Sequence, residues 1–220
     1  MEKILFLHGW GASGDIWRAT ENALKTISPS VFCVFPTFNC NPVSILTLEN
    51  YVDFIEPDLV NGPPVHIVAH SFGARVAILL ANRHPEMVKS IVFTGAAGLK
   101  PRFNFMKWIR IRLYKWFKIG WGSEDYRKLT PEGKATFRNI IGRDLYTDVA
   151  NLGRLGIKTL LIWGKRDRAT PIYMARRFKK LLPGAELKVY PHAGHYAFLD
   201  EPGQFVTDIT EFLGKITPEI

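Results

Sequence analysis

Short apolar runs alternate along the chain with stretches in which apolar residues recur every three to four positions. The runs predict strands, and the periodic stretches predict amphipathic helices. The expected strands cover residues 3–7, 31–35, 65–70, 88–94, 158–163 and 186–190, and the expected helices cover 15–27, 45–60, 73–83, 172–182 and 203–214. Strands that are apolar throughout are typical of a parallel sheet covered on both faces. The sequence therefore predicts an α/β protein with a mostly parallel sheet of about six strands.

The alternation of strands and helices is interrupted between residues 99 and 150 and resumes afterwards. We expect one α/β core made of residues 1–98 and 151–220, into which residues 99–150 are inserted as a helical segment. With 220 residues, of which 47% are hydrophobic, the chain can bury one sizeable core, and no second full domain is expected.

Ser71 lies where an expected strand meets the next expected helix, in the run Val-Ala-His-Ser-Phe-Gly-Ala of residues 68–74. A nucleophile on a sharp strand-to-helix turn needs small flanking residues, because the two backbones approach closely and the serine is held in a strained conformation. The usual pattern is Gly-x-Ser-x-Gly, and here Ala69 replaces the first glycine. So loose a pattern occurs by chance, and Ser71 alone could equally be a small residue at a tight turn.

Two later loops follow expected strands and carry groups that would serve such a serine. Residues 165–171 contain one carboxylate, Asp167, and residues 191–202 contain His192 and His195. Taken singly, Asp167 could be a helix cap and His195 an ordinary loop histidine. Together with Ser71 they form the order Ser, Asp, His, each on a loop after a strand, and three coincidences in that order are not expected.

The first expected strand runs straight into a glycine-flanked loop, Leu-His-Gly-Trp-Gly at residues 7–11. Such a loop can aim the backbone N–H of Trp10 at a developing oxyanion. The N–H of Phe72, directly after the candidate nucleophile, would be the second donor.

These motifs resemble the α/β-hydrolase superfamily, and within it a serine carboxylesterase-like member with a small helical cap. The resemblance implies a catalytic triad of Ser71, Asp167 and His195, since similar enzymes use the histidine that follows the glycine, which leaves His192 to loop packing. It also implies that residues 99–150 form a cap over the serine, and that the antiparallel hairpin preceding the family's oxyanion strand is missing here. Neither a metal nor an organic cofactor is expected.

The net charge of +9 is unevenly distributed. Residues 100–150 contain 12 Lys and Arg against 5 Asp and Glu, a net of +7, and the rest of the chain contains 17 and 15, a net of +2. Three aromatic residues of this segment, Trp108, Tyr114 and Trp121, are candidates to line the substrate pocket. A basic cap with aromatic side chains suits an acidic carrier protein, a membrane surface or an anionic substrate, whereas no nucleic-acid recognition fold is evident. Its apolar face could also simply cover the core.

A cytoplasmic location is expected from the chain's start and from its cysteines. Residues 1–3 run directly into an expected strand, without the leader that directs export, and no apolar stretch approaches the roughly 20 residues of a membrane span. Cys33 and Cys40 have no metal-type spacing, so both are expected to be reduced thiols.

The expected function is hydrolysis of small carboxylic esters with short to medium acyl chains, through a Ser-His-Asp triad and an acyl-enzyme. Two alternatives stay open. Residues 7–11 with Trp17 and Arg18 are similar to the opening of esterases that remove a methyl group from pimeloyl-acyl carrier protein, where a basic cap would receive an acidic carrier. A hydrolase-like ligand sensor with little turnover would carry the same triad.

Overall fold

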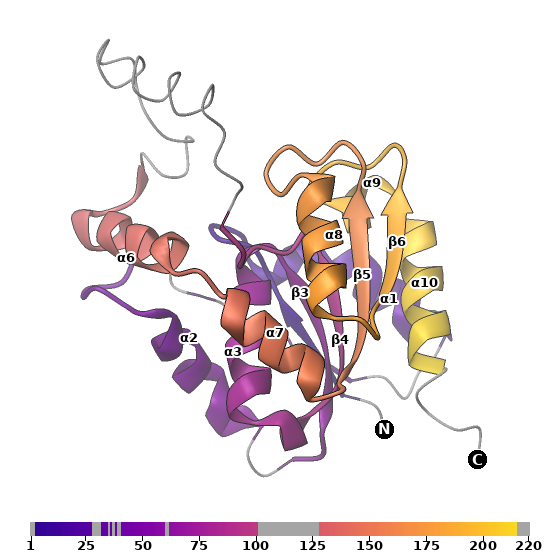
Figure 1. Ribbon diagram of the computed structural model, residues 1–220, viewed down its shortest axis with the longest axis horizontal. Helices are drawn as coiled ribbons and strands as arrows, with labels where there is room; N and C mark the ends of the chain where they lie inside the picture. The colour runs from indigo at the N-terminus through magenta and orange to yellow at the C-terminus, as the bar shows by residue number, and fades with distance from the viewer. Residues whose placement is uncertain are drawn as a thin grey trace.

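The six strands of the described residues form one parallel sheet (Figure 1). The structure, a computed structural model, describes residues 3–27, 32–34, 36, 38, 41–59, 62–100 and 128–214. The strand order is β2-β1-β3-β4-β5-β6, and every neighbouring pair runs parallel. The strands are β1 (Lys3–Leu7), β2 (Phe32–Val34), β3 (Val65–His70), β4 (Val88–Thr94), β5 (Lys158–Gly164) and β6 (Glu186–Tyr190). The carboxyl ends of all of these strands therefore meet at one edge of the sheet.

Helices cover both faces of this sheet, because successive strand residues point to opposite faces. In β1, Leu5 and Leu7 join a core with α2 (Leu48–Ile55), α3 (Phe72–Arg83), α7 (Tyr146–Arg154) and α8 (Ile172–Leu181). Ile4 and Phe6 of the same strand join a second core with α1 (Arg18–Ile27), α9 (Ala197–Asp200) and α10 (Pro202–Gly214). Short 3-10 turns occupy Gly14–Trp17, Glu56–Asp58 and Pro85–Met87. α6 (Pro131–Gly142) is joined by hydrogen bonds to Leu46, just before α2.

The predicted α/β architecture is confirmed, with small shifts at element ends. The helix expected over 45–60 is α2 followed by a 3-10 turn, and it begins at Leu48 because Thr47 and Asn50 form a capping box. The helix expected over 15–27 likewise starts as a 3-10 turn, with the Ser13 side chain accepting from the Asp15 amide. None of the helices in the described part of the chain has the length and hydropathy needed to cross a bilayer.

Among the helices of the described residues, α3 is the most deeply buried, with every residue from Phe72 to Ala81 buried. It packs so closely on β1 that a Cβ at Gly73 would overlap the backbone carbonyl of Leu7. Only glycine allows this approach, so Gly73 sets how tightly the chain turns from β3 into α3.

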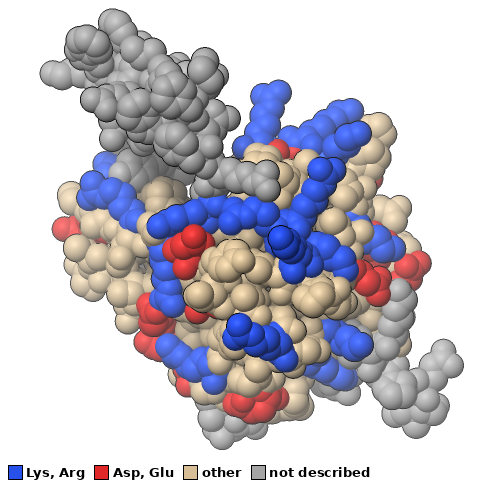
Figure 2. All heavy atoms as spheres, viewed as in Figure 1, with Lys and Arg blue, Asp and Glu red and all other residues tan. Residues whose placement is uncertain are grey.

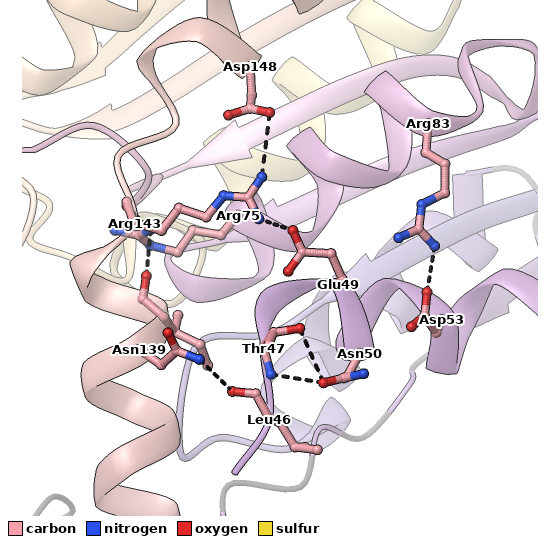
Figure 3. Close-up of polar contacts among 11 residues, drawn as sticks. Leu46, Thr47, Glu49, Asn50, Asp53, Arg75, Arg83, Asn139, Arg143 and Asp148 are labelled. Atoms are coloured by element: carbon pink, nitrogen blue, oxygen red, sulfur yellow. Dashed lines mark hydrogen bonds and ion pairs between the residues drawn. The ribbon is translucent and has the colours of Figure 1, made fainter.

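α6 is attached to the core by polar contacts at its carboxyl end. The guanidinium of Arg75, on α3, donates to the carbonyls of Ile140 at 3.0 Å and Arg143 at 2.9 Å. Burial lowers the pKa of Arg75 to about 10, which still leaves it charged at neutral pH, and helix ends attract cations through their unpaired carbonyls. Figure 3 shows the neighbouring contacts, in which Arg143 binds Glu49 and the amide of Asn139 donates to the carbonyl of Leu46.

These contacts bind α6 to the start of α2 and to the helix that begins after Ser71. The division into a core of residues 1–98 and 151–220 with an insert of 99–150 stays a prediction, since residues 101–127 lie outside the described part. Within the described part, α7 crosses the expected boundary at residue 150.

Gly73→Ala tests the tight turn from β3 into α3. The added methyl group meets backbone atoms of Leu7, so we expect the free energy of unfolding to fall by on the order of 1–3 kcal/mol, as overpacked sites do. Gly142→Ala is the matched control, because a Cβ there meets nothing within 4 Å, and its effect should stay within about 0.5 kcal/mol. Urea unfolding of both variants gives the comparison, and equal stabilities would contradict the close approach.

Candidate active site

Ser71 has the conformation expected of a nucleophile on a strained turn. Its φ of 50° and ψ of −110° make it the one described non-glycine residue with a positive φ. Such a backbone costs on the order of 1–3 kcal/mol and persists only where its surroundings fix it. Here the Ser71 amide donates to the carbonyl of Thr94 at 3.3 Å, and the Ser71 carbonyl accepts from Ala74 at 3.2 Å and Ala97 at 3.1 Å. The end of β4 and the loop after it therefore hold the backbone of Ser71 in place. Ser71 itself is only partly buried.

Asp167 and His195 form a hydrogen-bonded pair at the same edge of the sheet. His195 Nδ1 lies 2.8 Å from Asp167 Oδ2, where Asp167 follows β5 and His195 follows β6. The carboxylate also accepts from the amides of Ala169 and Thr170 and from the Thr170 hydroxyl, each at 2.8 Å. Burial on its own raises the pKa of Asp167, but the hydrogen bond and charge of His195 and the hydrogen bonds from Thr170 outweigh it, and the pKa is lowered.

A charged Asp167 fixes the tautomer of the imidazole. Since a carboxylate only accepts, His195 carries a proton on Nδ1, and Nε2 is left as the basic nitrogen. The segment from Thr94 to Ala97 is close to both this pair and the serine. It binds the Ser71 backbone, and a Cβ on its Gly95, whose φ is 52°, would come within 3.0 Å of His195 Nδ1 and 3.2 Å of Asp167 Oδ2. The three predicted residues are thus gathered around one loop.

The two predicted oxyanion donors flank Ser71. Phe72 is the first residue of α3, so its N–H has no partner within the helix. The peptide between Gly9 and Trp10 is oriented by its carbonyl, which accepts from His8 Nδ1 at 2.8 Å and from the Ala12 amide at 3.2 Å. In a trans peptide the N–H points opposite to the carbonyl, so the N–H of Trp10 points away from His8. A Cβ on Gly9 would lie 3.5 Å from the Ser71 Cβ, which places this loop beside the serine.

His8 is a supporting residue that sequence reasoning missed. The Phe38 amide donates to His8 Nε2 at 3.2 Å, so Nε2 is unprotonated and Nδ1 is the donor to Gly9. Burial also lowers the pKa of His8, which keeps the ring neutral. The position of His8 after a buried strand was the only sequence feature that pointed to a supporting role. That position does not indicate which atoms the ring contacts.

His70, the neighbour of Ser71, supports the loop of the candidate base. It is buried, and its Nε2 lies 3.2 Å from the carbonyl of His195, to which it donates. The rings of His70 and His195 lie 4.7 Å apart, and Tyr196 and Phe198 complete the packing around His70. Burial, together with the nearby His195, lowers the pKa of His70 to about 3, so this ring is neutral under ordinary conditions.

The whole-chain comparison identifies the family to which this arrangement belongs. The sequence model described as the alpha/beta hydrolase family matches residues 4–209. The chain belongs to the alpha/beta hydrolase family. The parallel sheet, the strained serine after β3 and the Asp-His pair after β5 and β6 are consistent with that membership.

Individual relatives of this alpha/beta hydrolase are distant. The chain is 25% identical over 186 residues to a 2-hydroxy-6-oxo-6-(2'-aminophenyl)hexa-2,4-dienoic acid hydrolase of Metapseudomonas resinovorans, an alignment that covers 74% of this chain and spans only 64% of that relative. It is also 25% identical to a pimeloyl-(acyl-carrier protein) methyl ester esterase of Chromobacterium violaceum, covering 96% of this chain and 93% of the relative. Among solved structures, an esterase from Exiguobacterium antarcticum matches with a TM-score of 0.76 at 18% identity, covering 96% of this chain and 91% of that one.

The remaining site predictions have mixed outcomes. Trp108, Tyr114 and Trp121, expected to line the pocket, lie outside the described residues. His192 is exposed, and its Nδ1 accepts from Arg166 at 3.2 Å rather than contacting Asp167. Cys33 is a free, half-buried thiol whose pKa burial raises to about 11, and Cys40 is outside the described part. In the described ranges, no group of three or more His, Cys, Asp or Glu side chains could hold a metal ion.

Aromatic rings surround the oxyanion loop of this alpha/beta hydrolase. The indole of Trp10 lies 5.2 Å from Phe72 and 5.3 Å from Phe137 of α6, and Tyr51 of α2 lies behind it at 6.3 Å. Phe72 and Tyr51 are buried, whereas Trp10 and Phe137 are partly exposed and form apolar surface next to the candidate oxyanion donors. Sequence reasoning missed Phe137, which sits in an ordinary amphipathic helix and carries no motif.

The neutral, buried His70 predicts a pH dependence of stability. Because its folded pKa of about 3 lies below the ordinary 6.5, the unfolded chain takes up a proton there as the pH falls from 6.5, and the folded protein does not. The contribution of His70 to the free energy of unfolding is therefore fully present above pH 6.5. It is lost as the pH falls toward 3, by up to about 1.4 kcal/mol per pH unit.

His70→Phe keeps a ring in the pocket and removes this titration. Between pH 6.5 and pH 4 we expect the free energy of unfolding to fall less steeply in the variant than in the wild type, measured by urea unfolding at half-unit pH steps. Parallel pH profiles of the two proteins would show that His70 is protonated in the folded state.

Proposed function

We propose that this protein is a serine hydrolase that cleaves carboxylic esters, with Ser71 as nucleophile, His195 as general base and Asp167 as the group that orients the base. The observation that carries the proposal is the strained backbone of Ser71 beside the hydrogen-bonded Asp167–His195 pair. Family membership supports a hydrolase in general. One relative that aligns with 96% of this chain, from Chromobacterium violaceum, is named as a methyl ester esterase.

The proposed reaction begins when Ser71 Oγ attacks the ester carbonyl carbon and its proton moves to His195 Nε2. The carbonyl oxygen becomes an oxyanion that accepts hydrogen bonds from the N–H groups of Trp10 and Phe72. When the carbon–oxygen bond to the alcohol breaks, His195 gives its proton to the leaving alcohol, and an acyl-enzyme remains.

Water completes the cycle by the same route. His195 accepts a proton from the water as it attacks the acyl carbon, and the second tetrahedral intermediate releases the carboxylic acid and restores Ser71. Asp167 stays ionised throughout, which agrees with its lowered pKa, and stabilises the imidazolium formed in both halves.

The proposed substrates are esters with short to medium acyl chains. The partly exposed rings of Trp10 and Phe137 lie next to the proposed oxyanion donors and suit an apolar acyl group. A second candidate, a methyl ester carried by an acyl carrier protein, is favoured by the similarity to the Chromobacterium violaceum esterase, whose name specifies that substrate.

Ser71→Ala should abolish the proposed activity. Turnover of 4-nitrophenyl acetate and 4-nitrophenyl butyrate is expected to fall by roughly 10³-fold or more, since the nucleophile is lost. Ser44→Ala, at an exposed serine in a loop, is the control and should retain wild-type turnover. A single burst without further release in the wild type would instead favour a ligand sensor, and turnover that survives Ser71→Ala would disprove the nucleophile.

His195→Ala and His192→Ala separate two histidines of one loop. Only His195 contacts Asp167, so its loss should lower kcat for 4-nitrophenyl butyrate by roughly 10³-fold or more. The exposed His192 contacts Arg166 instead, and its variant should stay within about twofold of the wild type. The reverse ranking would assign the base to His192.

A further inference from the structure

A second basic block lies in the described part of the chain, outside residues 100–150. Residues 154–180 contain nine Lys and Arg and one acid, Asp167, which is a net of +8. With the +7 of residues 100–150, the remaining chain must carry −6 to give the total of +9. The net of +2 for everything outside residues 100–150 is therefore the sum of a strongly basic block and an acidic remainder.

Most of these cations project into solvent from α8 and from the loop before it. Arg154 and Lys158 are exposed as well, but the exposed cations of α8 and of this loop are Lys165, Arg166, Arg168, Arg176 and Lys180, and we name these five residues the basic surface. Figure 2 shows Lys and Arg side chains predominating over the face on which α7 and α8 lie. The loop of the basic surface is also the loop of Asp167, so the surface begins at the rim of the candidate active site and continues along α8.

The cations of the basic surface form no ion pairs with carboxylates of the described residues. On the opposite face of the sheet, Arg18 pairs with Asp15 and Lys25 pairs with Glu21, each at 2.7 Å. By contrast, no cation of residues 154–180 pairs with a carboxylate in the described ranges; Arg166 contacts His192, for example. Arg176 and Lys180 are four residues apart on one helix, where like charges destabilise each other. An anionic partner would relieve that repulsion.

The dimensions and composition of the basic surface favour a protein as that partner. α8 has ten residues, which span about 15 Å, so the charge extends beyond the reach of one small anion. Among the described residues of this segment, Leu155 is the one large apolar side chain that is exposed, so there is little to insert into a bilayer. Of its aromatic residues, Trp163 and Phe178 are buried and Tyr173 is partly buried against the core, so the segment offers no fully exposed ring on which nucleic-acid bases could stack.

We propose that the basic surface binds an acidic protein, whose bound position next to the Asp167 loop lets it present an attached ester to Ser71. The binding depends on charge complementarity between this surface and carboxylates of the partner. The delivery of an ester rests on the proposed function, whereas the binding does not.

The test uses fluorescein-labelled poly-L-glutamate as the acidic polypeptide and follows binding by fluorescence anisotropy at about 0.1 M ionic strength, where the Debye length is about 10 Å. Arg176→Glu combined with Lys180→Glu should weaken binding by about tenfold or more, because exposed charges act through solvent at short range. Arg18→Glu combined with Lys25→Glu changes the net charge equally on the opposite face and should weaken binding less than about twofold. Thermal unfolding checks that both variants are folded.

Three results would overturn the proposal: wild-type protein that does not bind poly-L-glutamate, equal weakening by the two double variants, or a surface used by another class of partner. For the last, a deoxythymidine oligonucleotide and phosphatidylglycerol vesicles are tested in parallel. If binding of the oligonucleotide or of the vesicles depends on Arg176 and Lys180 while binding of poly-L-glutamate does not, the surface is assigned to nucleic acid or to membranes, respectively. Ser71→Ala should bind as the wild type does, so loss of esterase activity and loss of binding are separate results.

Discussion

The site depends on one local constraint, the strained turn between β3 and α3. Gly73 lets α3 approach the backbone of Leu7, and the carbonyl of Thr94 holds the amide of Ser71. These contacts come from the strands on either side of β3, so the sheet itself supplies the force that keeps Ser71 at a positive φ. A turn supported in this way presents the serine at the edge where the loops after β5 and β6 also end.

The three histidines near that turn have two kinds of role: His8 and His70 support loops, and His195 is the candidate base. His8 and His70 are buried and neutral, and each donates to a backbone carbonyl, of Gly9 and of His195 respectively. They therefore fix the oxyanion loop and the base loop without adding charge. The ionised Asp167 is the anion of the site, and its hydrogen bonds from Thr170 let it stay charged while it orients His195. Removal of any one support would loosen a different part of the same arrangement.

The sequence predicted the sheet and the positions of Ser71, Asp167 and His195, because each residue lies on the turn or loop after a recognisable strand and parallel strands end together. It could not predict the roles of His8 and His70, since the atoms that a histidine contacts depend on chains far away in sequence, such as Phe38 and His195. Phe137 was missed for the same reason, because its contact with Trp10 arises only when α6 packs against α2 and α3. The basic surface of α8 and the loop before it is present in the composition, but only the structure showed that its cations are exposed and pair with no carboxylate of the described residues.

The most direct test of the central claim is covalent labelling of the resting protein. A fluorophosphonate requires a serine activated by a base, and intact-mass and peptide mass spectrometry locate the adduct. The account predicts one adduct, on Ser71, formed more slowly in Asp167→Asn, where the imidazole loses its charged partner. An adduct on another side chain, or an equal labelling rate in that variant, would contradict the account.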